Sequence, residues 1–243
     1  MNPVRIPVVM SWSGGKDSAM ALHEVLRAGP YAIVALLTSV SAEYRRISHH
    51  GVREALLEDQ ADAIGIPLHK VYLPSSGSHP CTNEMYEQIM GDVMAGYKAQ
   101  GIETVAFGDL FLEDLRAYRE RNLAKAAMRG LFPLWKRDTA QLACEVIALG
   151  FKSYLSCVEG KVGPGFAGRP YDLALLAALP AGTDPCGEYG EFHTFVYDGP
   201  IFQRPVSVSV GDVVMRDGRH YADLLPEAIA TPAPPGVPVM PPV

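Results

Sequence analysis

The sequence is poor in cysteine and has no paired cysteine motif. Its cysteines are far apart, at Cys81, Cys144, Cys157 and Cys186. None forms the CxxC pair typical of zinc sites, iron–sulfur clusters and thioredoxin-like redox sites. The spacing argues against those three classes and indicates reduced thiols in a cytosolic protein.

The sequence also lacks a surplus of basic residues and a long apolar run. It has 21 basic and 27 acidic residues, a net charge of −6, which argues against a broad basic surface for nucleic acid. A local basic pocket for ATP or one specific tRNA is still compatible with that balance. No apolar run is long enough to cross a bilayer, and no charged leader precedes one. We therefore expect a cytoplasmic protein without a membrane partner.

The first half of the chain alternates short apolar runs with amphipathic stretches. We expect strands at residues 8–10, 32–38, 68–73 and 104–107. We expect helices after the loop that follows residue 10, and at about 51–65, 82–101, 115–129 and 139–149. Such alternation predicts right-handed βαβ units, and thus an α/β, Rossmann-like parallel sheet with helices on both faces. Ligands of such sheets lie at the carboxyl ends of the strands.

The pattern changes near residue 131. A strand is expected at 151–158, and antiparallel strands at 193–197, 201–210 and 213–215. We predict a nucleotide-binding domain over residues 1–130 and a smaller C-terminal α+β domain over 131–225, which would serve as acceptor side and lid. Residues 226–243 are rich in proline and predicted to be a loose tail.

The string SGGKDS at residues 13–18 follows the first strand and opens the first helix. Gly14 and Gly15 allow the backbone to approach an anion, and the helix N-terminus adds positive potential. Lys16 can neutralise phosphate charge, whereas Asp17 would be repelled by bare phosphate and is expected to bind Mg²⁺. A tight turn capped by Asp17 or Ser18 is the alternative, but it does not explain the whole string.

SGGxDS resembles the signature of the PP-loop, or N-type ATP pyrophosphatase, superfamily. Its members adenylate a carbonyl or carboxylate oxygen, and a nitrogen or sulfur nucleophile then displaces AMP. The resemblance implies two sets of ATP contacts. The β- and γ-phosphates would be held, with Mg²⁺, by Ser13, Gly14, Gly15, Asp17 and Ser18. The adenosine would lie near Thr38 and Ser39.

Two further strings lie outside the phosphate loop. In FGDL at 107–110, Gly108 lies at the predicted nucleotide edge and Asp109 could bind metal or a nucleophile, while Arg119 or Arg121 could offset charge on an adenylate. A helix cap with a solvated charged face is the alternative. In CGEYGEFHT at 186–194, Glu188 and Glu191 could point into an interdomain cleft, or into solvent from a glycine-rich turn.

Together, SGGKDS, FGD, Pro133-Leu134-Trp135 and GEYGEFHTFVYDGP resemble the diphthine–ammonia ligase family, including its prokaryotic relatives, over most of residues 5–210. The resemblance implies that ATP activates a carboxylate, possibly on a protein, and that ammonia converts it to an amide. It implies an acceptor side lined by Glu188 and Glu191. The expected catalytic set is Lys16, Asp17, Asp109, Glu188 and Glu191. A homodimer is compatible with it.

The chain also departs from the family pattern. It reads EYGE where the family more usually has two adjacent glycines, and it is too short for the extra C-terminal domains of eukaryotic members. Prokaryotic relatives also occur where no diphthamide is made, so the acceptor is left open. Two alternatives are a tRNA-modifying PP-loop enzyme and a non-catalytic ATP-binding regulator.

Some other residues carry weaker signals. His49 and His50, near Arg45 and Arg46, could contact phosphate or acceptor, although a polar loop is favoured. Buried structural roles are favoured for Cys157 and Cys186, and packing roles for Trp12 and Trp135.

Overall fold

The structure is a computed structural model that describes residues 5–47, 50–76 and 79–227. His49 and residues 228–243 of the predicted tail lie outside the described residues.

A five-stranded parallel sheet forms the first half of the molecule. Its strands are β1 (Ile6–Ser11), β2 (Tyr31–Ser41), β3 (Leu68–Leu73), β6 (Thr104–Ala106) and β7 (Arg129–Leu131). They are ordered β3-β2-β1-β6-β7 and are all parallel. The chain leaves β1 towards β2 on one side and returns to β6 on the other. The carboxyl ends of β1 and β6 therefore form the point where ligands bind in open α/β sheets.

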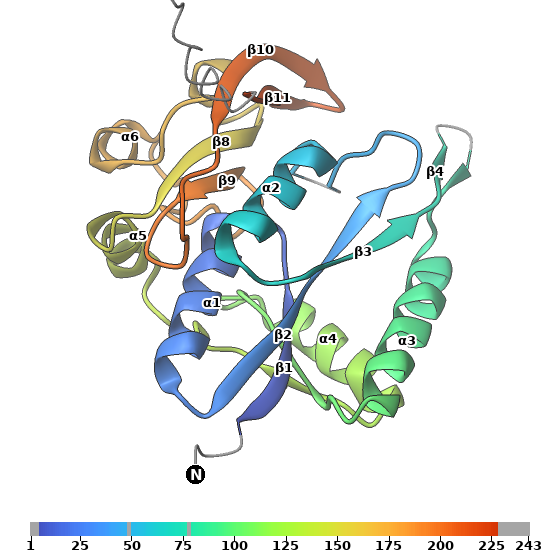
Figure 1. Cartoon of the computed structure of the whole chain (residues 1–243). Coiled ribbons are helices and arrows are strands. Elements are labelled where there is room, and N and C mark those ends of the chain that lie inside the picture. Colours follow the sequence, from blue (N-terminus) through green and yellow to red (C-terminus); the bar gives the residue numbers. More distant parts are fainter. Residues whose placement is uncertain (1–4, 48–49, 77–78, 228–243) are drawn as a thin grey trace, which may run out of the picture.

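Helices cover both faces of this sheet, as predicted. They are α1 (Lys16–Ala28), α2 (Glu54–Ile64), α3 (Asn83–Ala99) and α4 (Glu113–Lys125). Helices α1 and α2 lie between this sheet and a second one, whereas α3 and α4 cover the opposite face (Figure 1). The predicted cap of α3 is confirmed, because the Thr82 hydroxyl accepts a hydrogen bond from the Met85 amide at 3.2 Å.

The second sheet has four antiparallel strands, ordered β10-β11-β8-β9. They are β8 (Lys152–Glu159), β9 (Phe192–Asp198), β10 (Val208–Arg216) and β11 (Arg219–Pro226). The remaining elements are β4 (Ser75–Ser76), β5 (His79–Pro80), α5 (Thr139–Ala148), the 3₁₀-helix η1 (Pro164–Phe166) and α6 (Leu173–Ala178).

Three predicted elements were wrong in extent, and β11 was not predicted. The separate strand expected at 213–215 is part of β10, which runs from Val208 to Arg216. The strand expected at 201–210 begins only at Val208, because Phe202 turns back to bond the Gly199 carbonyl and Pro205 has no amide to donate. The helix expected to reach residue 129 ends at Lys125, and Arg129–Leu131 pairs with β6 as β7. Strand β7 crosses the domain boundary predicted at residue 130, and that division stays a prediction.

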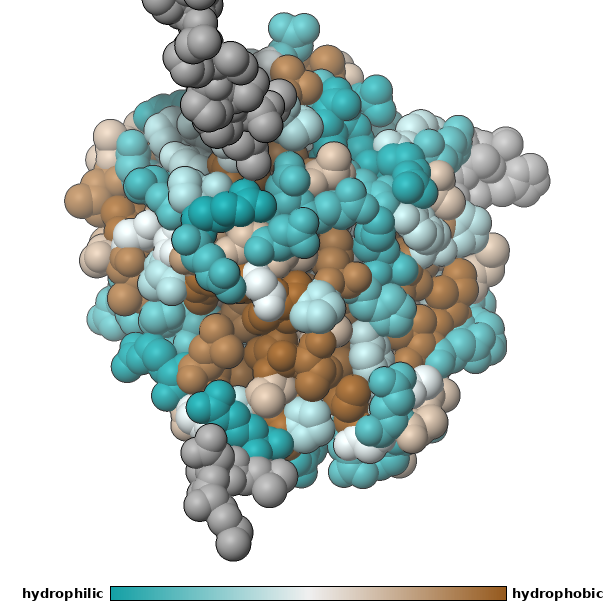
Figure 2. Space-filling model, in the orientation of Figure 1, coloured by the Kyte–Doolittle hydropathy of each residue, from teal (hydrophilic) through white to brown (hydrophobic). Residues whose placement is uncertain are grey.

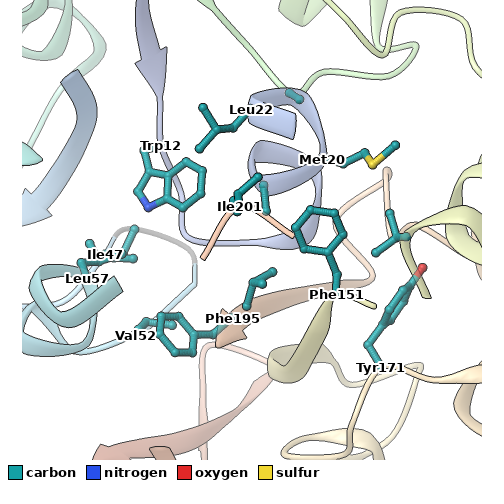
Figure 3. Close-up of a cluster of buried hydrophobic side chains, with 14 of the residues drawn as sticks. Trp12, Met20, Leu22, Ile47, Val52, Leu57, Phe151, Tyr171, Phe195 and Ile201 are labelled. Atoms are coloured by element: carbon teal, nitrogen blue, oxygen red, sulfur yellow. The ribbon is translucent and has the colours of Figure 1, made fainter. Parts of the chain in front are cut away.

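One hydrophobic core joins the two sheets. Trp12, Met20 and Leu57 come from the first half, and they share a buried cluster with Phe151 and Phe195 from the second (Figure 3). All five side chains are at most 3% exposed. The two sheets therefore depend on one another for burial of their facing surfaces.

On the face shown in Figure 2, hydrophilic residues cover the upper part and hydrophobic residues gather around the centre. Among the described residues, no helix has the length and apolar character needed to cross a membrane.

Candidate active site

A cavity of about 750 Å³ opens at the carboxyl ends of β1, β2 and β6. It brings together residues predicted from four separate segments of the sequence. The predicted site residues that line it are Ser13, Asp17, Ser18, Thr38, Ser39, Gly108, Asp109 and Glu188.

The phosphate loop needs glycine at position 14. Gly14 has a φ of +76°, and a Cβ there would lie 2.9 Å from both Gln60 Oε1 and Leu57 Cδ2. The Gly14 carbonyl accepts hydrogen bonds from the Val196 amide at 2.9 Å and from Gln60 Nε2 at 3.1 Å. A side chain would therefore both strain the backbone and displace these contacts.

Strand β9 of the second sheet completes the loop. The Lys16 amide donates to the Thr194 hydroxyl at 3.0 Å. Gln60 is fully buried, accepts from the Trp12 indole N–H at 2.7 Å and donates to the Val196 carbonyl at 2.6 Å. Gln60 and Thr194 are not predictable from the sequence, because no local pattern links residues so far apart along the chain.

The two serines and Gly108 lie close together at the start of α1. Ser13 Oγ and Ser18 Oγ are 3.2 Å apart, and the Ser18 hydroxyl donates to the Gly15 carbonyl at 2.9 Å. A Cβ at position 108 would be 2.7 Å from the Asp17 carbonyl carbon and 2.9 Å from the Ser18 nitrogen. Glycine at 108 therefore lets the end of β6 reach the phosphate loop.

Lys16 is not among the residues that line the cavity. Its ammonium donates to both Asp17 carboxylate oxygens at 2.9 Å and to the Cys186 carbonyl, and its side chain is 3% exposed. Burial, the largest single influence, lowers the pKa of Lys16, but Asp17, Cys186 and Glu188 together outweigh it and the net pKa is raised. A direct contact of Lys16 with phosphate stays a prediction.

The Asp17 carboxylate lines the cavity with its side chain 33% exposed. Desolvation raises its pKa, and the pairing with Lys16 opposes that rise. Within the described ranges, no three histidine, cysteine or acidic side chains cluster as a ready metal site. A single carboxylate with neighbouring hydroxyls does fit Mg²⁺, which is commonly held by one or two carboxylates and the substrate phosphates.

Asp109 is engaged by Arg119. The guanidinium donates to both carboxylate oxygens, at 2.6 and 3.1 Å, and lies 4.5 Å from the centre of the Phe107 ring. Both Asp109 and Arg119 line the cavity. Arg121, which sequence offered as an alternative to Arg119, is not among the lining residues and lies 6.0 Å from the Tyr118 ring centre.

The two predicted glutamates lie in different surroundings. Glu188 lines the cavity and accepts from the Leu110 and Phe111 amides at 3.2 and 3.1 Å. Burial raises its pKa. Glu191 is 2% exposed, and its carboxylate accepts from the Asp184 and Tyr189 amides at 3.2 and 3.0 Å. Glu191 thus holds its own turn and is not among the lining residues; its acceptor role stays a prediction.

Thr38 and Ser39 lie at the end of β2, and the position of an adenosine beside them stays a prediction. Both line the cavity, and the Thr38 hydroxyl is buried without a hydrogen-bond partner. Beside them an apolar chamber of about 200 Å³ extends between α3 and α4, and it shares Ser11, Leu37 and Phe107 with the main cavity. A buried hydroxyl without a partner next to an apolar chamber is suited to a flat, partly polar ligand.

Two histidines also line the cavity. His50 lies just before α2 and His193 is on β9, and their ring centres are 4.5 Å apart. The sequence favours a polar loop for His50 and predicts no role for His193. An isolated histidine in a glycine-rich string carries no signal of a partner on another element.

The weaker predictions for cysteine and tryptophan agree with the structure. Cys157 and Cys186 are buried and free. Trp12 is 2% exposed in the shared core, and Trp135 packs on Phe132 with ring centres 6.1 Å apart.

Comparison with known families shows two matches along the chain. Residues 6–129 match the model of the diphthamide synthase N-terminal domain, and residues 138–224 match that of the C-terminal domain.

Curated relatives have the name diphthine–ammonia ligase. The chain is 25% identical to that of Danio rerio over 86% of this chain and 89% of the relative. It is 26% identical to that of Homo sapiens, and 27% to that of Mus musculus, each over 86% of this chain and 85% of the relative. Among solved structures, a U34-tRNA thiolase from Methanococcus maripaludis matches with a TM-score of 0.38 and 15% identity, over 61% of this chain and 58% of that one. A likeness at that level supports no argument about function.

Proposed function

This chain belongs to the diphthamide synthase family, and we propose that it is an ATP-dependent ligase. It would adenylate a carboxylate and then transfer the acyl group to ammonia. The observation that carries the proposal is the cavity itself. One hollow at the carboxyl edge of the parallel sheet contains the phosphate loop, the Asp109–Arg119 pair and Glu188. ATP and a second substrate can therefore meet there.

The triphosphate is proposed to lie on the loop at residues 13–18. Gly14 allows the loop its left-handed backbone, Ser13 and Ser18 offer hydroxyl groups, and the start of α1 supplies positive potential. Asp17 would hold Mg²⁺, which would neutralise the leaving pyrophosphate when bound.

The adenosine is proposed to extend from Ser39 into the apolar chamber. The Thr38 hydroxyl, which is buried without a partner, would gain a hydrogen bond from the nucleoside. Met94, Val105 and Leu123 in the chamber wall offer apolar contact to the purine faces.

The acceptor is proposed to enter beside Glu188 and the Asp109–Arg119 pair. An acceptor carboxylate oxygen attacks the α-phosphorus, and the bond from that phosphorus to the bridging oxygen of the β-phosphate breaks. Ammonia then attacks the acyl carbon, and AMP leaves with both electrons of the acyl–oxygen bond. The nitrogen loses a proton, and we propose that Glu188 accepts it, because its carboxylate lines the cavity and burial raises its pKa.

The names of the relatives point to diphthine as the acceptor class, that is, a carboxylate carried on a protein side chain. We propose a carboxylate of this class for the present chain. We also propose that the enzyme acts in the cytoplasm. Sedimentation velocity distinguishes a homodimer from a monomer.

The test is AMP formation with paired omissions. Purified protein is given ATP, Mg²⁺, a diphthine-bearing protein and ammonium chloride, and AMP, pyrophosphate and amide are measured. We expect all three in equal amounts. Leaving out ammonium should stop amide formation but retain acid-dependent exchange of labelled pyrophosphate into ATP.

Two outcomes separate the alternatives. AMP formation that depends on tRNA instead of a carboxylate would support a tRNA-modifying enzyme. ATP binding without AMP under any acceptor, with Asp17→Asn changing only that binding, would support a regulator. Either result would reject the amide-forming ligase.

A further inference from the structure

We propose that His50 and His193 form a second wall of the triphosphate site. His193, whose Nε2 accepts from Arg219, would donate to the β- and γ-phosphates from Nδ1, and His50, whose Nδ1–H is directed to a backbone carbonyl, would donate from Nε2 as an imidazolium. The inference deepens the proposed function and rests on it. Neither the family matches nor the phosphate-loop motif assigns these residues a role.

The first step is their position. A Cβ built on Gly15 would lie 3.0 Å from His50 Cε1, so the imidazole stands directly against the phosphate loop. His50 Nδ1 is 3.2 Å from the Thr194 carbonyl oxygen, and Thr194 is the residue whose hydroxyl binds the Lys16 amide. His50 is thus fixed on the same scaffold as the loop.

The second step is the pairing of the rings. The His193 ring lies 4.5 Å from that of His50 with a tilt of 34°. Its Nε2 is 3.5 Å from Arg219 Nη1. One ring comes from the segment before α2 and the other from β9, so both halves of the chain contribute to this wall.

The third step is the charge of the cavity. Its described lining includes the carboxylates Asp17, Asp109 and Glu188. Among the described lining residues, Arg119 is the one lysine or arginine, and it donates to both carboxylate oxygens of Asp109. The Lys16 ammonium is directed to Asp17 and Cys186 instead. The two imidazoles therefore add hydrogen-bond donors for a departing pyrophosphate to the serine hydroxyls and the helix N-terminus of the loop.

The experiment separates binding of pyrophosphate from binding of the nucleoside. Isothermal titration with magnesium pyrophosphate and, separately, with AMP is carried out on the full chain and on His50→Phe and His193→Phe. Phenylalanine keeps a stacked ring but removes the N–H donors. We expect pyrophosphate affinity to fall about tenfold or more in each variant, with AMP affinity within twofold of the parent.

Matched variants guard against a general structural effect. His220→Phe, on β11 and absent from the cavity lining, should bind both ligands as the parent does. His50→Gln keeps a donor and should recover part of the lost pyrophosphate affinity. Pyrophosphate affinity unchanged in both phenylalanine variants, or an equal loss for AMP, would overturn the assignment.

A measurement on the unaltered protein covers the case in which a variant does not fold. Side-chain ¹⁵N resonances of His50 and His193 should shift on adding magnesium pyrophosphate and stay in place on adding AMP. Absence of that shift, with pyrophosphate shown to bind, rejects the histidine wall alone. If the parent binds neither pyrophosphate nor AMP, the proposed ligase function fails with it.

Discussion

At the scale of single residues, Glu188 accepts two backbone hydrogen bonds at a buried position that disfavours its charged form. Its carboxylate binds two backbone amides in the turn after β6, yet burial and the nearby Asp17 charge raise its pKa. A carboxylate with a raised pKa is more costly to keep ionised in the folded than in the unfolded chain.

The variant Glu188→Gln tests this conflict. Glutamine keeps the oxygen that accepts from Leu110 and Phe111 but removes the charge. Well below the ordinary pKa of 4.5 both states of the parent are protonated and the penalty vanishes; it appears as pH rises through the raised pKa. Urea unfolding should find the variant at least as stable as the parent at pH 7.5, with no such advantage at pH 4, while AMP formation falls.

Removing the acceptor altogether is the control. Glu188→Ala leaves both amides without their partner and should cost about 1–3 kcal/mol at either pH. A glutamine variant that is less stable than the parent at pH 7.5 would show that the charge itself stabilises the turn.

The different positions of Glu188 and Glu191 could not be predicted from the sequence. Both follow a glycine within three residues and look alike in the string GEYGE. The two side chains differ in position because the chain turns at Gly187, before Glu188, and again at Gly190, between the two glutamates; both glycines have positive φ. Glu188 then reaches the cavity, whereas Glu191 folds onto its own backbone.

At the scale of elements, β11 is tied to the start of α2 by charge. Asp223 on β11 accepts from Arg46 at 2.9 Å and from Arg53 at 3.0 and 2.7 Å. The hydrogen bond from Arg53 is the main cause that lowers the Asp223 pKa. The ion pairs bracket the segment that carries His50.

We therefore expect Asp223→Asn to be less stable than the parent by about 1 kcal/mol at pH 7, since the arginines are partly exposed. A lowered pKa stabilises above the ordinary value of 3.8 and is lost as pH falls through the lowered pKa. The difference in urea unfolding should therefore shrink as the pH falls below 3.8 and through the lowered pKa of Asp223. A difference that stays constant over that range would show that the ion pairs are not its cause.

Glu113→Gln is the control for this prediction. It removes a pair with Lys136 in which both side chains are more than half exposed. It should leave the stability unchanged.

Helix α3 offers a matched pair of glycines. Gly91 lines the apolar chamber and Gly96 lines a separate hollow near β2, and a Cβ at either would meet nothing within 4 Å. Leucine at either site should stabilise the helix by about 0.5–1 kcal/mol. Gly91→Leu should also weaken AMP binding about tenfold, whereas Gly96→Leu should not. Equal AMP affinity in titrations of the two variants would show that the nucleoside does not bind in the chamber.

The amphipathic helices of the first half were predicted from sequence, whereas strands β7 and β11 were not. Helices α1, α2 and α3 present several turns of apolar spacing and end at glycine, which determined their place. Strand β7 has three residues and reads as the end of a helix. It becomes a strand because the edge of β6 is open to pairing, which is a tertiary effect.

At the scale of the whole molecule, the nucleotide half is not independent of the rest. Val196 on β9 donates from its amide to the Gly14 carbonyl, and its own carbonyl accepts from Gln60, which also donates to Gly14. The neighbouring Phe195 is fully buried. We predict that residues 1–137 alone show no cooperative thermal transition by circular dichroism and no MgATP binding by titration.

Adding back the remainder is the control. Residues 138–227, expressed together with 1–137, should restore both properties. A lone 1–137 fragment that melts cooperatively and binds MgATP would show that the phosphate loop takes its shape without β9.

The same dependence marks the limit of prediction for the site. The phosphate loop, Thr38 and Asp109 follow apolar strands, so their shared edge is foreseeable from the parallel fold. Thr194 and His193 reach that edge across the shared core, and their partners lie in distant parts of the chain. Only the folded packing brings them together.

The bond between the Lys16 amide and Thr194 spans 178 positions of the chain. At about 5–20 residues per second, a ribosome needs roughly 9–36 s to make that stretch. The loop at residues 13–18 is thus made well before the strand that completes it. A nascent chain stalled before β9 would carry the full SGGKDS string and yet have no finished ATP site.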